Sequence, residues 1–449
     1  MIKLVLPPTP LASSFVSTLV IHITAKTIDS RLSLERGKHS ELYANIDVDT
    51  SEFIEILGQV LDELKPVKIF DKSSLPLVPK DFKTLSSLLG QRINRRSTNN
   101  VEIYEKLVNV IKSYRAKIVD DMSTLLVNVK NNYELCIGKC VCVGSSKGSK
   151  CKYPVPEVVR SDVFYEIGRF GGASDRRKKP SFSRIDYYAS TSYTALLYAL
   201  VLAFQSGYEP RTNSYMFTSM QLESGTITSP QAAVASQLYK RLSENIRRVG
   251  LQVWSQDYEG LRLAALLWLV AGYHKMLRES LAYGYPENLA FNLTVMSATG
   301  NRFYTLWSTS ISFAETDASL RALETLAEEL EADVYKVANY AAILIASTLK
   351  LCSEQTGGSV NDLWQGVKML AYALLTGSKH MIFDTLYRLL RLLDDPHTGL
   401  QSSLTNAVLS TANTIGVRID DVLPEGGEEK DRGRAVWRAL KKLVESLIM

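Results

Sequence analysis

The chain has 449 residues, of which 46% are hydrophobic and 22% are charged, and it carries a formal net charge of +5 at pH 7. This length suffices for two or three domains with their own cores, and the composition excludes a fibrous or globally disordered protein. Because the net charge is small, a site for a polyanion has to be a local patch of basic residues.

Residues 1–120 alternate between short apolar runs and stretches in which apolar residues recur at helical spacing. Strand patterns cover 3–6, 43–48 and 66–70, and helical patterns cover 13–27, 51–64, 82–93 and 101–118. Asp49, followed three residues later by Glu52, has the spacing of a capping box at a helix start. This alternation predicts an α+β N-terminal domain over residues 1–120.

Residues 121–188 are predicted to form a β-rich insertion that carries a cysteine cluster and a basic loop. Strand patterns cover 124–129, 133–143 and 162–167. Four of the five cysteines lie here, namely Cys136, Cys140, Cys142 and Cys151. Four thiolates are the number that a closed tetrahedral zinc site requires, so these cysteines are candidate ligands of a structural zinc ion. The alternative interpretation is that they are small buried side chains in a β-hairpin.

After residue 189 the apolar residues recur at helical spacing, and this pattern predicts an all-α helical bundle over 189–449. The expected helices cover 230–249, 257–284, 316–353, 359–377, 379–394, 400–415 and 430–448. Pro230 follows a serine at the first of these starts, while Gly250 and Gly377 stand at helix ends. Proline just inside a helix start and glycine just past its end are typical of helix termini.

Basic residues gather in three clusters within the first two hundred residues. There are seven basic and two acidic residues between Arg92 and Lys117, and seven basic and three acidic residues between Arg160 and Arg184. The lysines around the cysteines form the third cluster. Arginine and lysine supply phosphate contacts to nucleic acids, and the neighbouring aromatic residues can stack on unpaired bases. These aromatic residues are Phe170, Phe182, Tyr187 and Tyr188.

The clusters therefore predict a nucleic-acid interface. The residues expected to contact phosphates are Arg92, Arg95, Arg96, Lys150, Arg176, Arg177, Lys178 and Lys179. Arg177 or Lys178 is also a candidate for contact with a base edge. The alternative interpretation is a solvated surface loop with a buried aromatic root.

Catalytic motifs are few. The sequence contains no Gly-x4-Gly-Lys-Ser/Thr loop, no His-Glu-x2-His and no Gly-x-Ser-x-Gly. Arg391 and His397 have the Arg-x5-His spacing of helical ribonucleases of the HEPN type, which gives a metal-independent ribonuclease as the alternative function. Pro396 departs from that family's geometry, because it places His397 in a turn beyond the helix. A helix end explains the same residues.

The expected location is the cytoplasm. The first residues lack the features of a secretory signal, and the longest apolar runs, 195–204 and 263–273, are too short to span a bilayer. In a reducing compartment, clustered cysteines favour thiols or a metal site over disulfides.

The organisation of the whole chain resembles that of the large subunits of archaeal type I CRISPR effector complexes (Cascade), in particular type I-A. Three features carry the resemblance, namely the cysteines at 136–151, the basic loop at 176–179 and the helices around 369–393. It implies a non-catalytic subunit that binds CRISPR RNA and double-stranded target DNA at the protospacer-adjacent motif. It also implies contacts with other subunits of the complex and recruitment of a helicase-nuclease.

A further alternative is a structural adaptor or viral assembly protein without nucleic-acid binding, whose basic patches bind acidic partners. A salt-sensitive electrophoretic shift with nucleic acid distinguishes the two hypotheses.

Overall fold

The computed structural model is a mixed α/β structure with antiparallel sheets and a helical C-terminal region. It describes residues 1–7, 9–37, 42–66, 75–93, 99–129, 133–138, 153–160, 185–279, 287–300, 302–329, 333–355, 357–395 and 397–417. The chain divides into two compact units, which are described separately below. Unit 1 comprises 1–236 and 284–310, and unit 2 comprises 237–283 and 311–449. The division at residues 120 and 188 stays a prediction.

The first sheet of unit 1 has the strand order β1-β3-β2-β10. Its elements are β1 (Ile2–Leu6), α1 (Pro10–Thr24), β2 (Arg31–Arg36), β3 (Leu42–Ile46), α2 (Thr50–Glu63) and β10 (Thr226–Thr228). The succession β1-α1-β2-β3-α2, with β3 antiparallel to both β1 and β2, matches the first five elements of a split βαβ unit. The Asp49 side chain accepts a hydrogen bond from the Ser51 backbone N–H at 3.0 Å and so caps α2, which confirms the predicted helix start. The sequence analysis missed β2.

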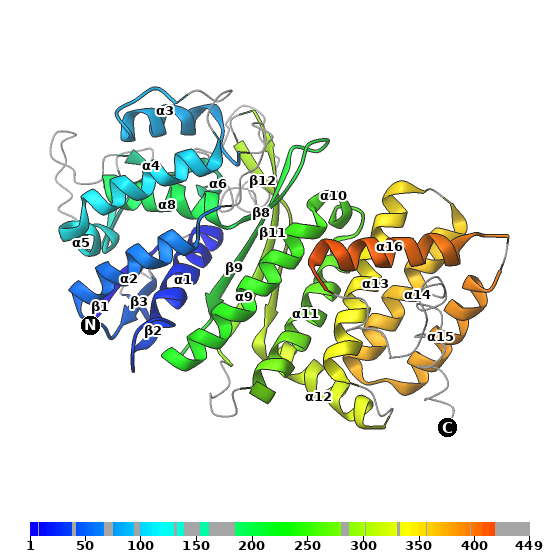
Figure 1. Ribbon diagram of the computed structural model, residues 1–449. Helices are drawn as coiled ribbons and strands as arrows, with labels where there is room; N and C mark the ends of the chain where they lie inside the picture. The colour runs from blue at the N-terminus through cyan, green and yellow to red at the C-terminus, as the bar shows by residue number, and fades with distance from the viewer. Residues whose placement is uncertain are drawn as a thin grey trace, which may run out of the picture. The chain divides into compact units, whose positions relative to one another are not determined.

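A group of helices forms the next layer of unit 1. They are α3 (Pro79–Leu88), α4 (Asn100–Ser113), the short 3₁₀ helix η2 (Arg115–Lys117), α5 (Ile118–Met122) and α8 (Thr191–Ala203). The residues of α8 from Ser192 to Ala203 are all buried, and α8 packs beside α4 (Figure 1). The predicted helix 101–118 ends earlier than expected, because the chain tightens into η2 after Ser113.

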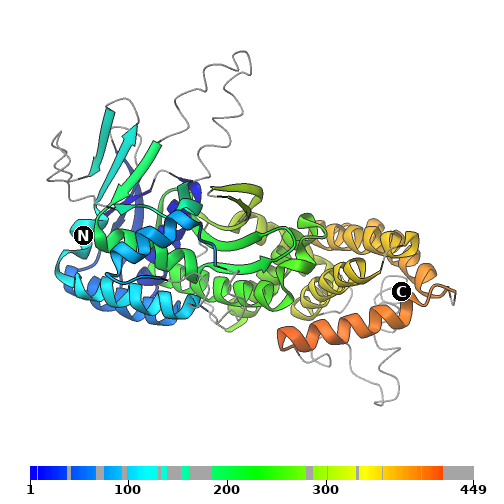
Figure 2. The same ribbon diagram turned by 90° about the horizontal axis from the view of Figure 1, so that it is seen from above.

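The second sheet of unit 1 has the order β5-β4-β7-β6. Its strands are β4 (Thr124–Val129), β5 (Tyr133–Gly138), β6 (Tyr153–Pro154) and β7 (Ile185–Ala189), and the short helix α6 (Glu157–Arg160) follows β6. Figure 2 shows β4 and β5 in teal beside β7 in green. The bounds of β4 are those that the sequence predicted.

The third sheet of unit 1 has the order β12-β11-β9-β8 and corrects the expectation of an all-α region after residue 189. Its strands are β8 (Gln205–Glu209), β9 (Ser214–Leu222), β11 (Leu289–Thr299) and β12 (Arg302–Ser312). Eight of the nine residues of β9 are buried, so both of its faces are covered. A strand buried on both faces lacks the polar–apolar alternation that identifies a strand from sequence.

Unit 2 is mainly helical. Its helices are α10 (Leu251–Trp254), α11 (Tyr258–Glu279), α12 (Phe313–Glu329), α13 (Val334–Glu354), α14 (Gly358–Thr376), α15 (Lys379–Leu393) and α16 (Leu400–Ile415), together with the second part of α9 (Ser229–Val249). The predicted helix 316–353 is two helices, because the Asp333 side chain accepts a hydrogen bond from the Lys336 N–H at 3.2 Å and caps α13. Gly377 ends α14 with φ of 67°. The predicted helix 430–448 lies outside the described residues.

Within the described ranges, no helix has an apolar stretch long enough to cross a bilayer.

Candidate nucleic-acid interface

One of the eight predicted phosphate-contacting residues lies in the described structure. Arg92 is exposed in the connection between α3 and α4, next to Ile93, whose backbone N–H donates to the Ser86 hydroxyl at 3.0 Å. The other seven, namely Arg95, Arg96, Lys150, Arg176, Arg177, Lys178 and Lys179, lie outside the described residues. The convergence of these eight residues stays a prediction.

The cysteine-bearing and basic segments both join the sheet β5-β4-β7-β6. Residues 139–152 connect β5 to β6. They follow Gly138, which lies opposite Thr124 of β4, and precede Tyr153, which lies opposite Ala189 of β7. Gly138 and Tyr153 thus lie at the Thr124 end of the sheet. Residues 161–184 connect α6 to β7, which begins at Ile185 beside Val129, the other end of β4. The sheet therefore holds both ends of residues 139–152 and the C-terminal end of residues 161–184, whose N-terminal end follows α6.

The net positive charge of these two segments together exceeds the net charge of the whole chain. Residues 139–152 contain four lysines and no acidic residue, and residues 160–184 contain seven basic and three acidic residues. Each segment has an excess of four positive charges, whereas the whole chain has a net charge of +5. The rest of the chain is therefore slightly acidic. These segments are the candidates for the local basic patch that a polyanion site needs in a chain of small net charge.

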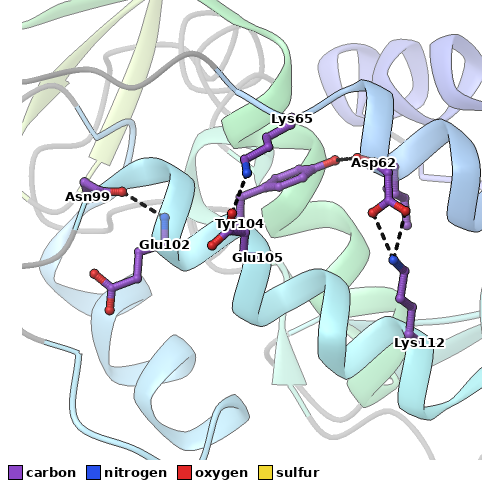
Figure 3. Close-up of polar contacts among 8 residues, drawn as sticks. Asp62, Lys65, Asn99, Glu102, Tyr104, Glu105 and Lys112 are labelled. Carbon is purple, nitrogen blue, oxygen red and sulfur yellow. Dashed lines mark hydrogen bonds and ion pairs between the residues drawn. The ribbon is translucent and has the colours of Figure 1, made fainter.

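Two lysines of the cluster at 92–117 are engaged in ion pairs on the described helix α4. Lys112 Nζ lies 2.9 Å from Asp62 of α2 (Figure 3). Lys106 Nζ lies 2.7 Å from Glu102, one turn earlier in α4. Glu105 of α4 also pairs with Lys65 at 2.5 Å. Between these pairs the Tyr104 hydroxyl donates to the Leu61 carbonyl at 2.5 Å. These contacts join α2 to α4 and leave Lys106 and Lys112 neutralised.

The buried carboxylate of Asp81 holds helix α6, which lies in the sequence between residues 139–152 and residues 161–184. Asp81 is 1% exposed and lies in the first turn of α3. Its oxygens accept hydrogen bonds from the Val78 N–H at 3.0 Å, the Glu157 N–H at 3.0 Å and the Tyr198 hydroxyl at 2.8 Å. Burial raises the pKa of Asp81 to about 6, although these three hydrogen bonds oppose the shift. Asp81 therefore ties α6 to α3 and α8, and residues 161–184 begin where α6 ends.

The predicted zinc ligands are only partly placed. Cys136 lies in β5 opposite Leu126, while Cys140, Cys142 and Cys151 lie outside the described residues. Among the side chains that the structure describes, no group of His, Cys, Asp or Glu is arranged to hold a metal ion. Because β5 and β6 are the outer strands, their axes are about 14 Å apart at ordinary strand spacing. A four-cysteine site therefore requires Cys151 to approach Cys136 across the end of the sheet.

Two of the four candidate aromatic residues lie in the described structure. Tyr187 and Tyr188 lie in β7 opposite Val127 and Leu126, and Tyr188 is half-buried. Phe170 and Phe182 lie outside the described residues.

The two residues of the ribonuclease alternative lie in different local structures. Arg391 is exposed in the last turn of α15, whereas His397 is exposed beyond that helix, where its N–H donates to the Asp395 carboxylate at 3.0 Å. A helix that continues through both residues is therefore absent from the part of the chain described here. Catalysis by these residues stays a prediction.

Sequence reasoning missed two features of unit 1. Asp81 follows Pro79 at a helix start, and this position is favoured for an acidic residue whether it is buried or exposed. The second feature is the pair of turns that connect β8 to β9 and β11 to β12. The dipeptide Gly300-Asn301 in the second turn is a signal for a hairpin, and Gly300 has φ of 62°.

No protein-family model matches the sequence, and a search of curated proteins finds no match.

Proposed function

We propose that this chain is a non-catalytic, nucleic-acid-binding large subunit of an RNA-guided CRISPR effector complex. In this proposal it binds CRISPR RNA and the double-stranded target DNA at the protospacer-adjacent motif, joins other subunits in the cytoplasm and recruits a helicase-nuclease. The observation that carries the binding function is the concentration of positive charge on residues 139–152 and 160–184, which both connect to strands of one sheet. The class of complex rests on the resemblance in chain organisation.

The division of charge within unit 1 supports this assignment. Lys65, which follows α2, pairs with Glu105 of α4, and Lys112 of α4 pairs with Asp62 of α2, so these two lysines support the contact between α2 and α4. The two segments carry an excess of basic residues that acidic residues within them do not balance. Phosphates of a nucleic acid supply the missing negative charge, and base pairing with the guide RNA supplies sequence recognition.

A structural zinc ion is part of the proposal. The supporting observation is that the segment carrying Cys140, Cys142 and Cys151 starts and ends at one end of the sheet, near the strand that carries Cys136. A zinc ion held there would fix the lysines of residues 139–152 relative to the scaffold. We expect one zinc ion per chain by elemental analysis, and its loss in Cys140→Ser and in Cys136→Ser. Zinc retained in Cys136→Ser alone would restrict the ligands to residues 139–152, and a zinc-free wild type would contradict the site.

The binding function is tested with the purified full chain and fluorescent DNA and RNA oligonucleotides. We expect binding whose affinity falls linearly with the logarithm of salt concentration, because phosphate contacts release counterions. Lys112→Ala is a matched control. It removes a positive charge from the cluster at 92–117, but that charge is paired with Asp62, so the affinity and the salt slope should stay unchanged. Absence of binding, or binding insensitive to salt, would contradict the proposed function.

A further inference from the structure

The turn 210–213, the end of β11 at Thr299 and the start of β12 at Arg302 lie at one end of the sheet β12-β11-β9-β8. The turn 210–213 connects β8 to β9, and β11 ends at Thr299 just before β12 begins at Arg302. Strands β9 and β11 are neighbours, with Ser214 opposite Ser297. The two turns are therefore separated by about two strand spacings, or roughly 10 Å.

Hydrogen bonds join the first turn to the end of β11. The Ala298 N–H donates to the Asn213 carbonyl at 3.1 Å, and Asn213 Nδ2 donates to the Ala298 carbonyl at 2.8 Å. The Ser297 hydroxyl donates to the Thr212 carbonyl at 3.0 Å. The first turn, the end of β11 and the start of β12 are named the platform here, and it comprises residues 211–213, 297–299 and Arg302.

Asn213 holds the platform in an uncommon backbone conformation. Its φ is 48°, which is sparsely populated by residues other than glycine. Its side-chain oxygen accepts hydrogen bonds from the Tyr215 hydroxyl at 3.1 Å and the Tyr208 hydroxyl at 3.5 Å. The Tyr208 and Tyr215 rings pack with centroids 4.9 Å apart, and Phe303 packs against Tyr215 at 5.7 Å. Residues that are held by their surroundings in a sparsely populated backbone conformation, as Asn213 is, are often found at functional sites.

The platform displays two exposed arginines. Arg211 follows Pro210 in the first turn, and Arg302 begins β12 after the second turn. Among the residues that the structure describes, neither guanidinium is in an ion pair. The carboxylate of Glu209 is buried and accepts a hydrogen bond from the Arg211 backbone N–H at 3.0 Å. The opposite end of the sheet carries the exposed acids Glu223 and Glu287, so the sheet has a cationic and an anionic end.

We propose that this platform contacts the phosphate backbone of single-stranded nucleic acid through Arg211 and Arg302. The backbone positions that carry the two arginines are about two strand spacings apart, roughly 10 Å, so both guanidinium groups can reach phosphates on one continuous strand. Tyr304 is half-exposed beside Arg302, and its hydroxyl hydrogen-bonds with Thr299 at 2.7 Å, so its ring is available to an unpaired base at the edge of the platform. This inference rests on the proposed function and adds a second contact region to it.

The platform is expected to contribute to binding in two ways, through charge and through geometry. The arginines supply charge, and Asn213 holds the turns that carry them. Removing both arginines should therefore lower the salt slope by about 1.4 for a single strand, at about 0.7 per phosphate contact. This equals about a sevenfold smaller loss of affinity between roughly 50 and 200 mM salt. Loss of the Asn213 side chain should instead lower affinity by about threefold and leave the slope unchanged, because the charges remain.

The test measures fluorescence anisotropy of a single-stranded oligonucleotide and of the matching duplex in a salt series, with the full chain. The variants are Arg211→Ala/Arg302→Ala, the charge-conserving Arg211→Lys/Arg302→Lys, and Asn213→Gly, which keeps the backbone conformation accessible. Arg31→Ala/Arg36→Ala is the matched control, because it removes two exposed arginines from β2 of the same unit.

The proposal predicts a lower slope with the single strand for the first variant alone, a smaller change with the duplex, and a wild-type slope for the lysine variant and the control. Equal slopes for the platform variant and the control would overturn the platform contact. If that result accompanies weaker binding by a variant of residues 176–179, the proposed function still holds. A wild-type chain that binds neither oligonucleotide would overturn the platform and the proposed function together.

Discussion

Replacing Asp81 with alanine is expected to destabilise unit 1 by about 3 kcal/mol, because three donors from α3, α6 and α8 lose a buried acceptor. Chemical denaturation measures this change. The variant should also release α6, so amide exchange at Glu157 should accelerate more than exchange at other buried amides. Exchange that rises equally at all buried amides would indicate a loss of stability without local release.

The pH dependence of stability gives a second readout of Asp81. Burial raises its pKa to about 6 in the folded chain, above the unfolded value of 3.8. The protonated form is therefore favoured by folding, and this contribution is complete below pH 3.8 and is lost as the pH rises to about 6. The difference in stability between wild type and Asp81→Asn should follow this window. His22, whose pKa burial lowers to about 4, titrates in the opposite sense, but it cancels in the difference.

Replacing Arg176, Arg177, Lys178 and Lys179 with alanine is expected to have the largest effect on nucleic-acid binding. Four lost contacts to duplex phosphates lower the salt slope by about 3.6, at about 0.9 per contact. The wild type should therefore lose about 150-fold more affinity than the variant between roughly 50 and 200 mM salt. Anisotropy titrations with duplex DNA measure both slopes.

A charge-conserving variant separates charge from geometry in this loop. Arg176→Lys/Arg177→Lys keeps the positive charge, so it should keep the salt slope, while a base-edge contact by Arg177 would be weakened and discrimination between DNA sequences reduced. A quadruple alanine variant with the slope of the wild type would remove residues 176–179 from the interface.

The sequence predicted local structure well where one side of an element is polar. The helices α2, α14, α15 and α16 were found because their apolar residues recur on one face. Asp49 also marks the start of α2, and Gly377 marks the end of α14. Elements buried on all sides have no such pattern. The strand β9 has apolar and small polar residues on both faces, so its sequence is compatible with a buried helix or a buried strand.

The sequence predicted which segments are rich in basic residues, but it did not predict which residues from distant parts of the chain lie close together. Counting charges identified the cluster at 92–117, but ion pairs to distant residues, such as that between Lys112 and Asp62, depend on how α2 packs against α4. The platform was missed for the same reason. Arg211 and Arg302 are 91 positions apart in the sequence, and the pairing of β9 with β11 is what brings their turns together.

We propose that unit 1 holds nucleic acid through the segments connected to the sheet β5-β4-β7-β6. Photo-crosslinking of the full chain to an iodouracil-containing oligonucleotide, followed by mass spectrometry of the linked peptides, locates the bound strand. We expect crosslinked peptides from residues 139–184. Crosslinks confined to the helices of unit 2, or no crosslinks under conditions that support binding, would contradict it.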